Sequence, residues 1–376
     1  MSIRKIHTFF RVLKNLSFFP LVPPKKKILL FDNNLEELLL KYIKPKDYAV
    51  LNIRDNRYNF YVLLKTFFTS FLNFSSLKYF NNYIKYTDPK IIITFSDNYK
   101  IFYKIEKPKK SKKIFIQGAW RTALNDIFSE IDELKKEKKN NVVDYMLVYS
   151  DIIGKKYSSF IQGKCLSIGS FRSNSYKIKK PKSKNIMYIS QWRDFDPNLN
   201  LTPTIKFIRY LKNQENLVKN LYNYCIRRKK KLIIYGKEPS KLKYKEKAFY
   251  KNILGNKNWT FVNNIREKSY DMADKYELIV NISSSMGYEA LSRGSKVAFF
   301  NTDVLDKTTS SKTFGWPNKF KSKGFFWDNN LSQAGCDQLL DKVLNYKKNY
   351  WIKISARYTK KMIRRDENNS KFVKLI

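Results

Sequence analysis

Short apolar runs rich in isoleucine, valine and phenylalanine recur along the chain, and each ends in small or polar residues. Runs of about four to eight such residues are typical of strands buried on both faces of a parallel sheet. The strands predicted in this way are 27–31, 48–53, 90–95, 113–116, 144–149, 164–168, 185–189, 231–235, 259–262, 278–282 and 296–300. Because helical segments separate many of them, we expect an α/β fold with doubly wound parallel sheets, whose ligand sites lie at the carboxyl ends of the strands.

The chain, at 376 residues, is long enough for two such domains, each with its own core. The segment SNSYKIKKPKSK is polar, basic and contains proline, which is typical of a linker. The expected parts are a leader (1–24), a first domain (25–172), the linker (173–184), a second domain (185–345) and a C-terminal helical segment (346–376).

The leader alternates basic residues with bulky apolar ones, and its apolar run is too broken by charge to span a bilayer. A basic amphipathic segment of this kind lies on a membrane surface or packs as a helix on the first domain. The sequence leaves both interpretations open.

Residues 277–301 form the most informative stretch, with a strand, a serine-rich turn, a short helix that ends at Gly294, and a further strand. Unpaired N–H groups at the start of a helix attract anions, and serine hydroxyls add donors, so the turn predicts a phosphate site. We expect Gly287 to permit close approach of the ligand and Glu289 to accept hydrogen bonds from ribose hydroxyls. The candidate ligand-binding residues of this turn are Ser283, Ser284, Ser285, Gly287 and Glu289. The alternative is that one serine merely caps the helix; a capping box is excluded because Met286 stands three residues before the glutamate.

This pattern, S-S-x-G-x-E-A-L-x-x-G followed by K-V-A-F-F, resembles the donor-nucleotide motif of GT-B glycosyltransferases. More narrowly, it is similar to bacterial surface-carbohydrate (O-antigen or capsule) biosynthesis proteins. The segments IIITFSDN (91–98), IQGAWR (116–121) and YISQW (188–192) resemble strand-end signatures of the same family, so the resemblance extends over roughly residues 26 to 330. It implies two Rossmann-like domains facing a cleft, the first for the acceptor and the second for a nucleotide sugar, with a last helix that crosses back to the first domain.

Glycosyl transfer requires a grip on the leaving phosphate, and a cation assists this grip. Arg193 and Lys237 follow strands of the second domain and are the candidate cations, with a solvated surface charge as the alternative for each. A metal-dependent mechanism would use an Asp-x-Asp pair, and Asp194-Phe195-Asp196 is one, although its spacing and the following Pro197 also suit an ordinary turn. We expect no metal and no cofactor.

An inverting transfer also requires a base for the acceptor hydroxyl. The only histidine, His7, lies in the leader, which argues against a histidine base, a histidine metal site and a Ser-His-Asp triad. Asp97 and Asp32 end strands of the first domain and are the candidate bases, with helix capping as the alternative for both. Gln117 and Arg121 are expected to position the acceptor or donor.

The formal net charge is +43, and lysine supplies most of it. This excess indicates either a compositional bias or attraction to a polyanion, such as an anionic membrane or nucleic acid. No nucleic-acid-binding module is recognisable, which argues against nucleic acid. The three cysteines show no metal or disulfide spacing, as in a reducing cytoplasm.

The sequence therefore predicts a cytoplasmic glycosyltransferase, peripheral at the inner face of the plasma membrane. Its partners would be a nucleotide-sugar donor and a lipid-linked or polysaccharide acceptor. Two alternatives remain open: a phospho-alcohol transferase on the same fold, against which the missing histidines argue, and a non-catalytic basic protein that binds membranes or nucleic acid.

Overall fold

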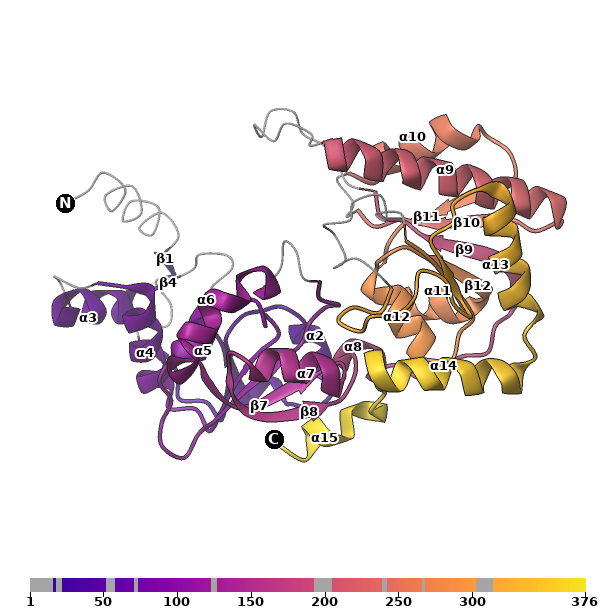
Figure 1. Ribbon diagram of the computed structural model, residues 1–376. Coiled ribbons are helices and arrows are strands. Elements are labelled where there is room, and N and C mark those ends of the chain that lie inside the picture. Colours follow the sequence, from indigo (N-terminus) through magenta and orange to yellow (C-terminus); the bar gives the residue numbers. More distant parts are fainter. Residues whose placement is uncertain are drawn as a thin grey trace. The chain divides into compact units, whose positions relative to one another are not determined.

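The computed structural model describes residues 16–17, 22–51, 58–70, 74–122, 127–192, 205–238, 242–265, 268–301 and 314–376. The chain forms two compact units (Figure 1). The first comprises Met1–Gly118, Glu130–Ser175 and Asp366–Ile376, and the second comprises Ala119–Ser129 and Tyr176–Arg365. The division at Ser175 falls within the expected linker, whereas Ala119–Ser129 was assigned to the first domain by sequence and belongs to the second unit.

The first unit contains a six-stranded, fully parallel sheet with the order β3-β2-β5-β6-β7-β8. Its strands are β2 (Ile28–Leu30), β3 (Tyr48–Val50), β5 (Ile91–Thr94), β6 (Lys112–Ile116), β7 (Val142–Val148) and β8 (Gln162–Ser167). The isoleucine-rich β5 is buried along its whole length, as expected for a central strand covered on both faces. A separate two-stranded ladder joins β1 (Leu16–Ser17) to β4 (Tyr58–Asn59).

Helices and single turns connect these strands. They are α2 (Glu36–Leu39), α3 (Phe60–Ser70), α4 (Ser76–Thr87), α5 (Ile101–Lys104), α6 (Ile131–Lys136), α7 (Asp151–Ser158) and α8 (Phe171–Asn174). In α4, Ser75 caps the first turn, and Asp88 ends the helix in the left-handed conformation directly before Pro89. The sequence thus specifies both ends of this helix.

The C-terminal segment completes the first unit with a 3₁₀ turn, η8 (Glu367–Asn369), and α15 (Ser370–Val373). Asn369 is fully buried; its amide donates to the carbonyl of Phe171 at 2.9 Å and accepts from Asn174 at 3.0 Å. Phe372 is also fully buried, and its ring lies 5.0 Å from that of Phe171. Asn369 and Phe372, which follow the second unit in sequence, therefore belong to the core of the first unit.

The second unit contains a six-stranded parallel sheet with the order β11-β10-β9-β12-β13-β14. Its strands are β9 (Ser183–Ile189), β10 (Leu232–Tyr235), β11 (Trp259–Val262), β12 (Tyr276–Asn281), β13 (Val297–Phe300) and β14 (Trp327–Asp328). In chain order this is 3-2-1-4-5-6, the order of dinucleotide-binding Rossmann folds. The predicted α/β fold with two Rossmann-like, doubly wound domains is confirmed.

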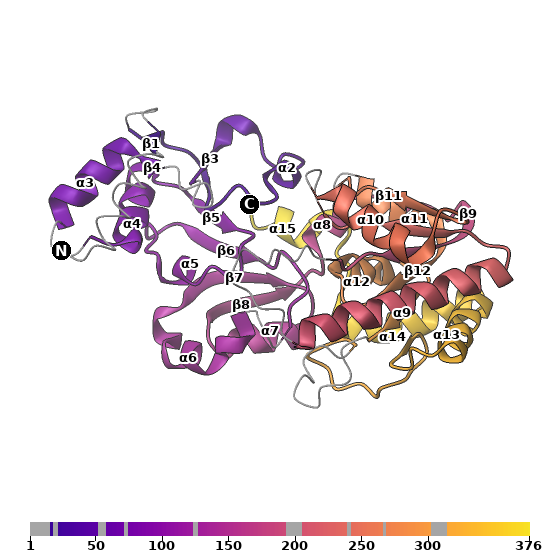
Figure 2. The ribbon, with the colours of Figure 1, turned by 90° about the horizontal axis from the view of Figure 1, so that it is seen from above.

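Six helices of the second unit lie among the described residues: α9 (Ile205–Arg227), α10 (Lys243–Leu254), α11 (Ser269–Lys275), α12 (Ser285–Ser292), α13 (Gln333–Asn345) and α14 (Lys348–Met362). Figure 1 shows α9 and α10 on one face of the sheet and α12 and α14 on the other. In Figure 2, α9 runs beside α13, to which it is tied by an ion pair of 2.5 Å between Arg227 and Asp337.

A buried ion pair fixes the point at which the chain enters the second unit. The Arg293 side chain is fully buried and pairs with the buried carboxylate of Asp274. The same guanidinium donates to the carbonyls of Tyr176 and Lys177 at 3.1 and 2.8 Å. These bonds satisfy the buried charges, as such a pair requires, and they connect α11, the end of α12 and the segment at Tyr176 and Lys177.

No helix in the described part of the chain is both long and apolar enough to cross a membrane.

Candidate functional site

The candidate site lies where the strand order of the second unit reverses, between β9 and β12. At such a switch point the connections from neighbouring strands leave in opposite directions and open a crevice at the carboxyl ends. Gln191 follows β9, and Ser283 follows β12. The Ser283 hydroxyl donates to Oε1 of Gln191 at 3.4 Å, so the two strand ends meet directly.

The turn after β12 is built around Asn281, the last residue of that strand. Its Oδ1 accepts from the Ser284 N–H, and its Nδ2 donates to the Ser284 carbonyl, each at 3.1 Å. Ser284 in turn caps α12, with its hydroxyl accepting from the Met286 N–H at 3.3 Å. Simple capping by one serine, which the sequence left open, therefore applies to Ser284.

Gly287 leaves room for a buried side chain of the protein itself. A Cβ at this position would lie 2.2 Å from Cγ and Nδ2 of Asn281, so the missing side chain makes room for the asparagine. The protein itself fills this space, and the expectation that Gly287 permits close approach of a ligand stays a prediction. The glycine acts by letting Asn281 brace the turn.

Ser285 faces a segment that the sequence placed in the other domain. Its hydroxyl accepts from the Trp120 N–H at 2.8 Å. The Trp120 indole stacks on the Tyr288 ring, with centroids 3.8 Å apart and an interplanar angle of 4°. Full burial raises the pKa of Tyr288, whose hydroxyl accepts from the Gly315 N–H at 3.1 Å. The segment Ala119–Ser129 thus contacts the first turn of α12.

Glu289 is 6% exposed, and its Oε2 accepts from the hydroxyl of Tyr270 on α11 at 2.9 Å. The Tyr270 ring also lies 5.0 Å from the guanidinium carbon of Arg293. The carboxylate of the expected ribose-binding residue is therefore oriented by a tyrosine from the neighbouring helix.

Lys237 follows β10, beside the switch point, and a buried carboxylate organises its backbone. Glu246 on α10 is fully buried and accepts from the Lys237 N–H at 2.9 and 3.1 Å and from the Glu238 N–H at 2.9 Å. Burial raises the pKa of Glu246, against the opposing effect of hydrogen bonds from Ser190 and from these two backbone groups. Lys237 Nζ donates to the Trp192 carbonyl at 3.5 Å, so this cation lies against the loop that follows β9.

Arg193, the other expected cation, lies outside the described residues, and so do Asp194 and Asp196 of the alternative metal pair. Within the described ranges, no cluster of three or more histidine, cysteine, aspartate or glutamate side chains could hold a metal ion.

The two candidate bases lie at the carboxyl edge of the first unit's sheet, and both are buried. Asp32 is 2% exposed; it accepts from the Asn34 N–H at 2.7 Å and from the Thr94 hydroxyl at 2.8 Å. Asp97 is fully buried; it accepts from the Gly118 N–H at 3.1 Å and from the Tyr157 hydroxyl. Each carboxylate thus accepts a hydrogen bond at both of its oxygens from residues of neighbouring elements.

Gln117 is also buried, and its side-chain oxygen accepts from the Tyr149 N–H at 2.9 Å. This bond ties the end of β6 to the end of β7 within the first unit. Arg121 is half-buried and belongs to the second unit. The two expected positioning residues, four apart in sequence, are therefore assigned to different units.

The structure brings five of the predicted donor residues to one edge of the second sheet, namely Ser283, Ser284, Ser285, Glu289 and Lys237. Sequence reasoning missed Asn281, Glu246 and Trp120. A signal for Glu246 was present, because it shares the buried face of α10 with Tyr250 and Leu254 at a spacing of four residues. A carboxylate on an apolar helix face indicates a buried acceptor with specific donors.

Two parallel six-stranded sheets, the second with a serine-rich turn at its switch point, define a GT-B-type protein with two Rossmann-like domains. The chain belongs to a family of surface-carbohydrate proteins: residues 114–376 match the model described as "putative O-antigen biosynthesis protein". No curated protein sequence matches the chain.

Among solved structures, the wall teichoic acid polymerase TagF has 11% sequence identity, covers 100% of this chain and 97% of its own, and has a TM-score of 0.52. S. aureus MnaA, solved with UDP, has 13% identity over 93% of this chain and 95% of its own, with a TM-score of 0.49. S. aureus TarM has 16% identity over 80% of this chain, with a TM-score of 0.46. The chain spans 58% of the TarM chain and 60% of the pneumococcal O-GlcNAc transferase GtfA. At these identities the likeness to TagF establishes the fold alone.

Proposed function

We propose that the protein is a glycosyltransferase that moves a sugar from a nucleotide-sugar donor to a growing surface polysaccharide or lipid-linked glycan. The observation that carries the proposal is the serine-rich turn at the switch point of the second sheet, which has the strand order of nucleotide-binding folds. The family's description as O-antigen biosynthesis supports the substrate class.

We assign the donor phosphates to the first turn of α12. The Ser285 N–H has no acceptor among the described residues, and the Ser283 hydroxyl forms only a long bond of 3.4 Å. Both groups, together with the partial positive charge of the helix N-terminus, favour an anion. Lys237 would add a full charge, and Glu289, oriented by Tyr270, would accept from the ribose.

The acceptor side is assigned to the first unit. Because Asp32 and Asp97 each have both oxygens engaged, we propose that they order the loops at the carboxyl edge. Asp97→Asn separates this role from that of a base: loss of a general base lowers the rate by about 10²–10⁴-fold, whereas an asparagine still accepts from Gly118 and preserves most of a positioning role.

The experiment measures the thermal stability of the purified chain with UDP, GDP, CDP, CMP and ADP. A nucleotide present at a hundredfold excess over its Kd adds about 2.7 kcal/mol to stability. Ser283→Ala should weaken binding of the responding nucleotide by about tenfold or more, because a hydrogen bond to a charged group contributes about 1.5–3 kcal/mol. Ser292→Ala, at the other end of the same helix, is the matched control and should leave the response intact.

Absence of any response would contradict the proposal. A response confined to cytidine nucleotides would favour the phospho-alcohol alternative and prompt a test of CDP-linked alcohols as donors.

Association with an anionic membrane surface is also proposed, on the net charge of +43. Salt-sensitive sedimentation with anionic but not neutral vesicles tests it. The basic leader, for which the sequence left membrane contact and packing on the first domain both open, lies outside the described residues, apart from 16–17 and 22–24.

A further inference from the structure

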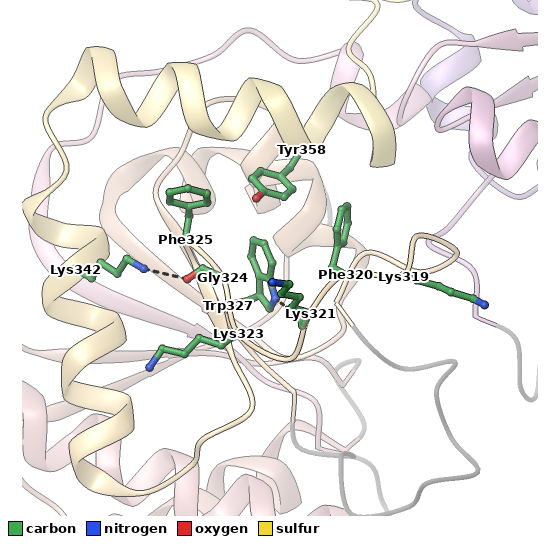
Figure 3. A pocket seen from close by; sticks show the side chains of 9 residues that line it. All are labelled: Lys319, Phe320, Lys321, Lys323, Gly324, Phe325, Trp327, Lys342 and Tyr358. Carbon is green, nitrogen blue, oxygen red and sulfur yellow. Dashed lines mark hydrogen bonds between the residues drawn. The ribbon is translucent and has the colours of Figure 1, made fainter.

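A cavity of about 520 Å³ lies in the second unit. It is at the amino ends of the strands, whereas the serine-rich turn is at their carboxyl ends. The loop 319–326 that forms one wall precedes β14, so the cavity is at the amino end of that strand. Helices α13 and α14 complete the wall (Figure 3). Its volume lies within the range of about 300–1,000 Å³ typical of small-molecule sites.

The interior of the cavity is aromatic. The Tyr358 ring lies 5.0 Å from Trp327, 5.4 Å from Phe320 and 6.2 Å from Phe325, measured between centroids. These rings are fixed in place: a Cβ at Gly324 would lie 2.1 Å from the Trp327 indole, whose Nε1 donates to the Lys321 carbonyl at 2.8 Å. The cavity therefore presents preformed flat apolar surfaces.

Lysines surround these rings. Lys342 donates to the Gly324 carbonyl at 3.1 Å, and Lys323 pairs with Asp328 at 3.1 Å. Lys319 and Lys321 are exposed, and neither has an ion-pair partner within the described ranges. No carboxylate is among the described residues that line the cavity, so it favours an anion.

The burial of Trp327 distinguishes a discrete anionic ligand from an anionic membrane surface. Trp327 is only 4% exposed, so its indole cannot insert into a bilayer as interfacial tryptophans do. A discrete ligand that enters the cavity can pack on the rings and extend its charge to the lysines. A sugar ring has apolar C–H faces for such packing, and a phosphate or carboxylate substituent supplies the charge.

We propose that this cavity is a binding site for an acidic sugar, that is, a sugar ring carrying a phosphate or a carboxylate. The ring packs against Tyr358, Phe320 and Phe325, and the anionic substituent binds Lys319 and Lys321. The site is separate from the serine-rich turn, and it does not depend on the proposed transferase activity.

Calorimetric titration of the full chain at low ionic strength tests the proposal, with glucose 6-phosphate and glucuronic acid as probes. Saturable binding of either probe is expected, at least tenfold tighter than that of glucose or inorganic phosphate. Lys319→Gln/Lys321→Gln should weaken it on the order of tenfold, since an exposed ion pair contributes up to about fivefold. Lys247→Gln/Lys251→Gln, which removes the same charge from the exposed face of α10, should leave binding unchanged.

Equal weakening by both lysine pairs, or inorganic phosphate binding as tightly as glucose 6-phosphate, would overturn the proposal. So would binding of phosphatidylglycerol vesicles that needs Lys319 and Lys321 but does not compete with glucose 6-phosphate. An acidic tetrasaccharide that binds more tightly than the monosaccharides would support the proposal with a polymer as the source. Equal affinities of the tetrasaccharide and the monosaccharides would support free acidic sugars as the source. The nucleotide response should persist in Lys319→Gln/Lys321→Gln, which separates this site from the donor site.

Discussion

Gly287→Ala tests the account of the serine-rich turn most directly. The new Cβ would lie 2.2 Å from two atoms of the Asn281 side chain, well inside the contact distance of about 3.5–4.0 Å. Asn281 is fully buried, so its side chain would have to leave Ser284 in order to move. The substitution should therefore disrupt the turn without touching a ligand.

The magnitude follows from the bonds at risk. Asn281 forms two hydrogen bonds to Ser284 backbone groups, each contributing about 1 kcal/mol. Against this loss, alanine is favoured over glycine inside a helix by up to about 1 kcal/mol. The expected net loss is about 1–2 kcal/mol. In an Asn281→Ala background the clash is absent, so Gly287→Ala should become neutral or stabilising, with a coupling energy of about 2 kcal/mol between the two positions.

The assay is urea unfolding followed by tryptophan fluorescence. All six tryptophans belong to the second unit, so the signal reports the unfolding of that unit alone. Gly335→Ala, in the first turn of α13, is the matched control. Its Cβ would lie 2.5 Å from the Asn330 side chain, so the substitution should lower stability but leave the nucleotide response unchanged. If Gly287→Ala leaves stability intact and abolishes the nucleotide response, the glycine serves the ligand and our reasoning fails.

Three further predictions concern buried charges. Burial lowers the pKa of Lys113 from 10.5 to about 8, so between these two pH values the folded state binds fewer protons than the unfolded state. The stability of the wild type relative to Lys113→Met should therefore rise with pH across that window, on the order of 1–3 kcal/mol, as measured by circular dichroism. Arg293→Met should cost about 3–5 kcal/mol in the same fluorescence assay, because Asp274 is left buried without its partner, and adding Asp274→Leu should recover part of the loss. The pKa of Glu246 is raised in the folded state, so the wild type loses stability as pH rises above 4.5. The difference in stability between the wild type and Glu246→Gln should therefore shrink between pH 4.5 and 7. A difference that grows over this range would contradict the raised pKa.

The fold was predictable because a strand buried on both faces leaves a strong local signal. The run Ile91–Thr94 has no polar alternation, so it fits few environments other than the centre of a parallel sheet. Strand order left no such signal, since it depends on pairing between segments far apart in sequence. The adjacency of β9 and β12, which creates the switch point, appeared only in the structure.

The site was predictable where the residues lie close together in sequence and not where they come from elsewhere. Ser283–Ser285 were found from a single turn. Trp120 reaches the same turn from a distant segment, and no periodicity indicates such a contact. The contact between Gly287 and Asn281 was not predictable, because a sequence shows that a Cβ is missing but not which neighbour fills the space.

The position of Asp366–Ile376 in the first unit bears on how the protein folds during synthesis. The strands of this unit leave the ribosome early, yet Asn369 and Phe372, which complete its core, are translated only after the whole second unit. Until then the surfaces around Phe171 and Tyr42 that receive Phe372 remain uncovered. The first unit therefore cannot finish folding before the second has been made, so the order of translation is not the order in which the two cores are completed.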